Sequence, residues 1–364
     1  MTTKHYSYTP LQPGSIRVLE LDGSDGKQDP LRCMLSHTAL SRDDDGDYQG
    51  LSYEWGDEKD VGDTLTVNDL PYPVRLRRNL EQALREIRGG RGTRLRLWVD
   101  AICINQADAD EKSHQVAMMG EIFKKATNVI AWIGPATEGS DLAMDLLSPD
   151  NIGSIEEEVC GKLSHESPEL NDLLDLVNRT YWGRVWVIQE LYHAKDHVIR
   201  CGSKTVHRDD FEQLIGAMMP PSEPLDKTWA MAMTQSAAVL HYRPWRGTKI
   251  SEDTCLDWLY RCWGRDLKAT DPRDYIYALV SVSSDLADGQ VVSNYSRDKH
   301  YAFVQVVRAV GHGDPITAAV LVDFAQRKMG LEVGDGLLRG VSDITGVSVQ
   351  TIQQVLEMRA HILG

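Results

Sequence analysis

Apolar positions along the first part of the chain change spacing several times, and each change predicts a new element. Near-continuous apolar runs at 49–55, 97–106 and 129–133 predict three short strands. Between them, two stretches carry apolar side chains three and four residues apart, which is typical of helices with one buried face. These side chains are Leu80, Ala83, Leu84 and Ile87, then Val116, Met119, Phe123 and Ala126. This order of strands and helices favours a parallel sheet flanked by helices.

The pattern becomes more helical further along the chain. An acidic insertion follows the third strand, with a leucine-bearing helix near Glu169–Val177. A helix is predicted at Trp182–Ala194 and a fourth strand at His197–Cys201. Beyond residue 205 the spacing is mostly helical. We therefore expect an α/β fold with a mostly helical C-terminal extension.

These changes suggest a division of the chain into four parts. They are a lead-in at 1–44, an α/β core at 45–205 with an insertion at about 136–180, a helical elaboration at 206–285, and a helical tail at 286–364.

Composition narrows the class of protein. The chain has 364 residues, 42% of them hydrophobic, and a formal net charge of -15 from 54 acidic and 39 basic residues. Such a charge repels a phosphate backbone, so we expect no nucleic-acid partner. The six cysteines lack metal-type spacing, the N-terminus lacks an apolar signal segment, and no run reaches the roughly 18 apolar residues that span a membrane. We expect a cytoplasmic protein with neither a metal nor a membrane span.

The second apolar run, LWVDAICINQ, ends in polar residues. Asp100 interrupts it, and Asn105 and Gln106 close it. In open α/β sheets, ligands bind at the carboxyl ends of the strands, so these side chains are candidates for one wall of a crevice. Each also has a structural alternative, because a buried Asp can bind backbone N–H groups and Asn and Gln are common in turns.

Glu190 is the leading candidate for chemistry. It lies in the apolar sequence WVIQEL, with Trp186 one helical turn before it. A carboxylate beside an indole in a partly dry cleft can hold sugar hydroxyls and stabilise positive charge on an anomeric carbon. The structural alternative is an ion pair with a cation such as Arg184.

A second group of candidates lies at the end of the first strand. Ser52, Tyr53, Trp55 and Gly56 bring a hydroxyl, two aromatic rings and a flexible backbone to that position, although core packing also explains the aromatic rings. No phosphate-binding loop, zinc-protease motif or nucleophile elbow is present in the sequence.

Four blocks together resemble the fungal heterokaryon-incompatibility (HET) domain family. They are GLSYEWGD at 50–57, LWVDAICINQADADEKSHQVAMMGEIFKKATNVIAWIG at 97–134, YWGRVWVIQEL at 181–191 and ATDPRDYIYAL at 269–279. The resemblance covers roughly residues 45–285. That family is similar to Toll/interleukin-1 receptor (TIR) domains, which have a flavodoxin-like parallel sheet. The resemblance therefore implies the same sheet here.

The resemblance implies two alternative functions. Some TIR domains cleave NAD at the nicotinamide glycosidic bond with a glutamate on the helix after the third strand, and Glu190 has that place here. By the same analogy, Ser52, Tyr53, Trp55 and the loop after LWVDAICINQ would line the nicotinamide and ribose pocket, with NAD as substrate and no cofactor. The protein would then be an effector of fungal non-self recognition, cell death and innate immunity. The alternative is a non-catalytic assembly module that acts through a second copy of itself or through a partner incompatibility protein.

Overall fold

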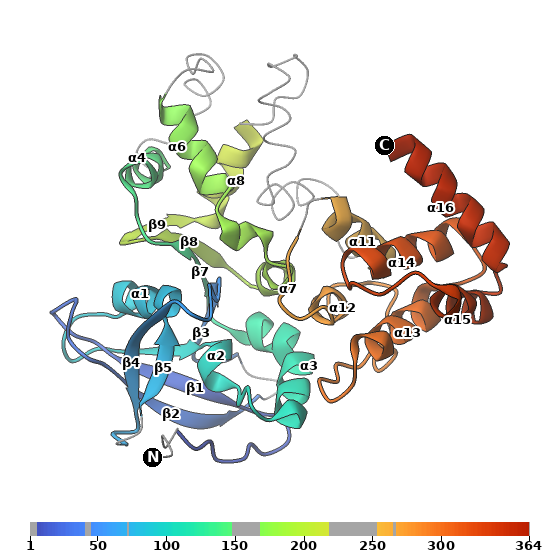
Figure 1. The fold of residues 1–364 in the computed structure, drawn as a ribbon. Helices are drawn as coiled ribbons and strands as arrows, with labels where there is room; N and C mark the ends of the chain where they lie inside the picture. The colour runs from blue at the N-terminus through green and yellow to red at the C-terminus, as the bar shows by residue number, and fades with distance from the viewer. Residues whose placement is uncertain are drawn as a thin grey trace.

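The computed structural model describes residues 6–40, 45–70, 73–147, 168–217, 253–264 and 267–363. In these ranges the chain forms a nine-stranded mixed sheet with the order β5-β4-β2-β1-β6-β3-β7-β8-β9 (Figure 1). Helices flank the sheet, and the C-terminal helices form a separate layer beside it. The predicted α/β fold and helical C-terminal region are confirmed. Of the stretch beyond residue 205 that is predicted to be mostly helical, residues 218–252 lie outside the described residues.

The strands are β1 (Ser15–Asp22), β2 (Leu31–Ala39), β3 (Gln49–Tyr53), β4 (Val61–Val67), β5 (Val74–Arg77), β6 (Arg94–Trp98), β7 (Val129–Gly134), β8 (His197–Cys201) and β9 (Lys204–His207). In the sheet core the helical elements are α1 (Arg78–Ile87), α2 (Asp100–Cys103), α3 (Ala109–Lys125), α4 (Glu138–Leu146), α6 (Pro168–Val177), the 3₁₀ turn η1 (Thr180–Gly183), α7 (Trp186–Tyr192) and α8 (Arg208–Ala217). The C-terminal helices are α11 (Cys255–Gly264), α12 (Asp274–Val280), α13 (Lys299–Val310), α14 (Pro315–Arg327), α15 (Asp335–Thr345) and α16 (Val349–Leu363).

Four central strands form a continuous parallel block of the sheet, and further out β2 and β4 also pair in parallel. Strands β6, β3, β7 and β8 are neighbours and all pair in parallel. In chain order this is 2-1-3-4, the order of flavodoxin-like sheets. Antiparallel pairing continues the sheet beyond both sides of this core, through β1 next to β6 and β9 next to β8. Residues of the lead-in segment thus contribute β1 and β2 to the same sheet.

The structure corrects the predicted strand at 97–106. Strand β6 ends at Trp98, and the chain turns at once into the short helix α2. The backbone N–H groups of Ile102 and Cys103 both return to the carbonyl of Val99, at 3.0 and 2.7 Å. Ile102, Cys103 and Ile104 are buried in this turn as they would be in a strand. An apolar run alone does not distinguish these two conformations.

The predicted helix at Trp182–Ala194 is confirmed only in its second half. The chain first forms η1, then passes through Arg184 with extended dihedral angles (φ -78°, ψ 133°), and only then enters α7. Arg184 is thus an extended residue between two helical elements, and it is part of the candidate functional site.

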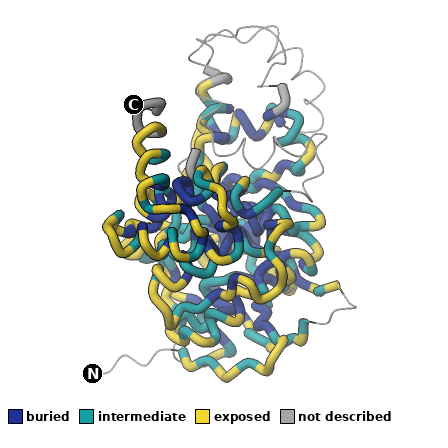
Figure 2. The backbone as a smooth tube through the Cα atoms, turned by 90° about the vertical axis from the view of Figure 1, so that its right-hand side faces the viewer, coloured by how far each residue is buried: buried dark blue, intermediate teal, exposed yellow. Residues whose placement is uncertain are grey.

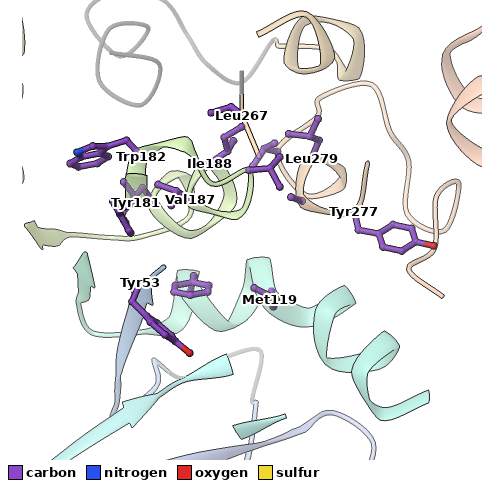
Figure 3. Close-up of a cluster of buried hydrophobic side chains, with 14 of the residues drawn as sticks. Tyr53, Met119, Tyr181, Trp182, Val187, Ile188, Leu267, Tyr277 and Leu279 are labelled. Carbon is purple, nitrogen blue, oxygen red and sulfur yellow. The ribbon is translucent and has the colours of Figure 1, made fainter. Parts of the chain in front are cut away.

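Buried side chains connect the sheet to the helical region, and Figure 2 shows the buried positions running through both. On the sheet side, Phe123 of α3 meets Trp98 edge to face, with ring centroids 5.5 Å apart. Gly50 of β3 leaves room for this ring, because a Cβ there would lie 2.9 Å from it. Figure 3 shows Ile188 of α7 near Leu267, which precedes α12, and Leu279 of α12.

A buried ion pair joins the N-terminal strand to the loop after α2. Arg17 of β1 is 1% exposed and donates from both terminal nitrogens to the carboxylate of Glu111, at 2.6 and 2.9 Å. It also donates to the carbonyls of Cys103 and Thr9. Glu111 in turn accepts the N–H of Asn105 at 2.7 Å. Arg17 thereby fixes the loop that carries the polar end of LWVDAICINQ.

Replacing Arg17 with Met should destabilise the protein by about 3–5 kcal/mol, because the Glu111 carboxylate would remain buried without its cation. Urea unfolding at neutral pH measures this loss. The double variant Arg17→Met/Glu111→Leu should recover most of it, since no uncompensated charge remains. Equal stability of the single variant and the wild type would show that the pair does not hold this loop.

Candidate functional site: a cleft at the carboxyl ends of the central strands

A cleft of about 810 Å³ opens beside the carboxyl ends of β3 and β6. The sheet core supplies one wall, and the segment before α12 together with residues near the start of α13 supplies the other. The lining residues used below are Trp55, Gly56, Arg77, Asp100, Gln106, Lys112, Arg184, Trp186, Lys268, Asp271, Arg273, Asp274, Tyr295 and Lys299. Ligand sites of proteins commonly have this size, and open α/β sheets bind ligands at this edge.

The floor of the cleft forms where β3 and β6 end. The indole N–H of Trp55 donates to Asp100 Oδ2 at 2.8 Å, and the N–H of Ala101 donates to Oδ1 at 2.7 Å. Gln106 donates from its side chain to the Asp100 carbonyl at 3.0 Å. Gly56 turns the chain away with φ +72°, a left-handed conformation that favours glycine. Asp100 is therefore held in place on both carboxylate oxygens.

A backbone pairing with the helical region holds Arg184 at the wall. The Lys268 N–H donates to the Gly183 carbonyl at 2.7 Å, and the Val185 N–H donates to the Lys268 carbonyl at 3.0 Å. These bonds form a parallel bridge between Arg184 and Lys268. Both side chains line the cleft, so the two cations lie next to each other in its wall.

Glu190 lies buried behind this wall. Glu190 is 2% exposed, and it is not among the residues that line the cleft. Ser52 donates a hydrogen bond to Oε2, and the hydroxyls of Ser52 and Tyr181 lie 2.7 Å apart. Arg184 Nη1 approaches the same Glu190 oxygen at 3.4 Å. The Glu190 carboxylate thus contacts Arg184, which lines the cleft, but does not line the cleft itself.

Burial raises the pKa of Glu190, and nearby Asp100 raises it further, whereas Arg184 and Ser52 act in the opposite direction. Asp100 follows the same pattern, because burial raises its pKa and Arg184 and Trp55 lower it in part. One guanidinium therefore compensates two carboxylates. Pairs of carboxylates with raised pKa values in a cleft are typical of functional sites, although structural networks show them too.

The structure places the sequence-predicted residues in three positions. Trp55, Gly56, Asp100, Gln106 and Trp186 line the cleft. Ser52, Tyr53 and Glu190 are buried next to it. Asn105 does not line the cleft, and its side chain accepts the N–H of Ala107 at 3.3 Å, as a loop residue does.

Asp274 is a further carboxylate of the cleft that the sequence analysis did not identify. Trp186 donates its indole N–H to Oδ2 at 3.0 Å, and Tyr295 donates its hydroxyl to Oδ1 at 2.6 Å. Burial raises the pKa of Asp274 to about 6, although these two hydrogen bonds lower it in part. The signal for Asp274 in the sequence is the polar run DPRD inside the fourth block.

Basic residues are the second feature that the sequence analysis missed. In the part of the chain that the structure describes, six cations line the cleft, namely Arg77, Lys112, Arg184, Lys268, Arg273 and Lys299. This number exceeds what a chain of net charge -15 suggests. They come from different segments of the chain, so no local run of basic residues reveals them.

Within the described part of the chain, His, Cys, Asp and Glu side chains form no group of three that could hold a metal ion. A search of the same residues for a helix long and apolar enough to cross a membrane also finds none.

A family model and a curated relative match parts of this chain. The family model "Heterokaryon incompatibility protein (HET)" matches residues 48–190, from just before β3 to Glu190. The chain is also similar to "Heterokaryon incompatibility protein 6, OR allele" of Neurospora crassa, with 27% identity over 351 residues. That match covers 81% of this chain and 51% of the Neurospora protein, so the chain spans about half the length of this curated relative. No solved structure matches the chain.

The matched region contains the parallel strands β3, β6 and β7 and the helix that carries Glu190. Together with the similarity over most of the chain, this match makes the protein similar to the heterokaryon-incompatibility (HET) family.

Proposed function

We propose that this protein is an effector of heterokaryon incompatibility, in which fungal non-self recognition leads to cell death, and that its cleft hydrolyses NAD. The family match and the name of the Neurospora relative support the first part. The second part rests on one observation, the pair of carboxylates, buried Glu190 and partly buried Asp100, that share Arg184 at a cleft of about 810 Å³.

The position of the pair suits the reaction. Hydrolysis at the nicotinamide glycosidic bond passes through a state with positive charge on the ribose. Glu190 would accept hydrogen bonds from the ribose hydroxyls and stabilise that charge, because a carboxylate in a dry site interacts strongly with it. Nicotinamide leaves with the bonding electrons, water adds to the ribose carbon, and one proton is released.

For this step Arg184 has to move. Its guanidinium contacts Glu190 and lines the cleft, whereas Glu190 does not line it. Arg184 also interacts with Asp100, so it can keep a negative partner when it releases Glu190. We propose that a bound substrate draws Arg184 from Glu190 toward Asp100 and exposes the Glu190 carboxylate to the ribose.

Glu190→Gln should abolish NAD turnover by the purified protein at high concentration, because an amide keeps the shape of the side chain and removes its charge. Chromatography of nicotinamide and ADP-ribose measures this. The amide still accepts the Ser52 hydrogen bond, so far-ultraviolet circular dichroism should match that of the wild type. Glu138→Gln on α4 is the control, since Glu138 is exposed and outside the cleft, and it should retain full turnover.

Turnover by Glu190→Gln equal to the wild-type rate would exclude Glu190 as the catalytic group. If the wild type and both variants consume no NAD even when crowded, the catalytic proposal fails. The assembly module of the sequence analysis, acting through a second copy or a partner protein, would then be the better account.

NAD binding should weaken as the pH rises through about 6. Asp274 is neutral below this pKa and becomes a carboxylate above it, in the cleft that has to accept the anionic diphosphate. Calorimetric titration of the Glu190→Gln variant with NAD between pH 5 and 7.5 separates binding from turnover. Asp274→Asn in the same background should flatten this dependence. An unchanged pH dependence would show that Asp274 does not face the ligand.

A further inference from the structure

Among the described residues, two lysines of the cleft have neither an ion pair within 4.0 Å nor a side-chain hydrogen bond. Of the six lining cations, Arg184 contacts Glu190 and Arg273 forms a pair with Asp271 at 2.6 Å. Lys299 donates to the carbonyls of Met329 and Gly330. The Arg77 guanidinium lies over the Trp55 ring and donates to a backbone carbonyl. The two that remain are Lys112 and Lys268.

Within the described ranges, neither lysine has an ion pair within 4.0 Å. The Lys112 ammonium lies over the Tyr295 ring, 4.0 Å from its centroid, which orients it without neutralising it. The Lys268 backbone is held on both its N–H and its carbonyl by the Arg184 segment. Neither ammonium group has a direct carboxylate partner, and Lys112 interacts at longer range with Asp271 and Asp274.

Lys112 and Lys268 lie in different parts of the fold. Lys112 comes from the first turns of α3, on the sheet side, and Lys268 comes from the segment before α12. Both line the same cleft, next to Asp274 and Arg184. Ammonium groups without a direct ion pair in a cleft favour an anionic ligand, and two of them from different segments suit a ligand with two adjacent anionic groups.

We propose that Lys112 and Lys268 form a diphosphate subsite, and that the ligand of the cleft is a nucleotide with a diphosphate group. This inference rests on the proposed function, because it supplies the site for the diphosphate of NAD while Glu190 faces the ribose next to nicotinamide. It goes further in naming the residues that select the ligand class. Arg184, next to Lys268 in the wall, is close enough in the fold to join them once it leaves Glu190.

Calorimetric titration with ADP and with adenosine tests the subsite, since the two probes differ only in the diphosphate. The wild type should bind ADP at least about tenfold more tightly than adenosine, the value of one charge-assisted hydrogen bond. The double variant Lys112→Gln/Lys268→Gln should lose this difference and leave adenosine binding unchanged. Lys124→Gln, an exposed lysine at the other end of α3, is the matched control and should bind ADP as the wild type does.

Equal binding of ADP and adenosine by the wild type, or undiminished ADP binding by the double variant, would overturn the subsite. Glu190→Gln separates this outcome from failure of the proposed function. If Glu190→Gln loses turnover while the lysine variant binds ADP normally, the subsite is wrong and the reaction stands. If Glu190→Gln turns over NAD normally while the lysine variant loses ADP binding, the subsite stands and the role of Glu190 is wrong.

Discussion

The guanidinium of Arg184 interacts with two carboxylates, the buried Glu190 on α7 and the partly buried Asp100 at the start of α2. Burying two carboxylates near each other is costly unless a cation compensates them, and Arg184 is the cation that acts on both. The neighbouring geometry follows from this constraint. Ser52 and Tyr181 supply hydroxyls on the Glu190 side, and Trp55 supplies its indole N–H on the Asp100 side.

Arg184 can occupy this position because the helical region holds its backbone. The chain at Arg184 is extended between η1 and α7, and Lys268 pairs with the residues on each side of it. The segment before α12 is thus part of the site, and it also brings Lys268 and Asp274 to the cleft. Arg17 acts in the same way from the other end of the chain, since its pair with Glu111 fixes the loop that carries Gln106. The site therefore depends on residues outside the range 48–190 that matches the HET family model.

Local sequence patterns predicted the parts of the fold that depend on local periodicity. Helices α1 and α3 and strands β3, β7 and β8 follow from apolar spacing, and Trp55, Asp100, Gln106 and Trp186 do line a cleft. The turn at Asp100 was not predictable in this way, because a buried turn and a buried strand have the same apolar composition. Strand β1 carries the buried Arg17 among apolar residues, which obscures its pattern. Lys112, Lys268 and Asp274 meet only through tertiary contacts, so no local motif reports their proximity.

The most direct test of the proposed function is a crystal structure of the Glu190→Gln variant with NAD at saturating concentration. We expect NAD in the cleft, with nicotinamide and its ribose beside Trp186 and Asp100. The Arg184 side chain should be turned away from residue 190. NAD bound elsewhere, or a cleft without ligand in which Arg184 keeps its place, would contradict it.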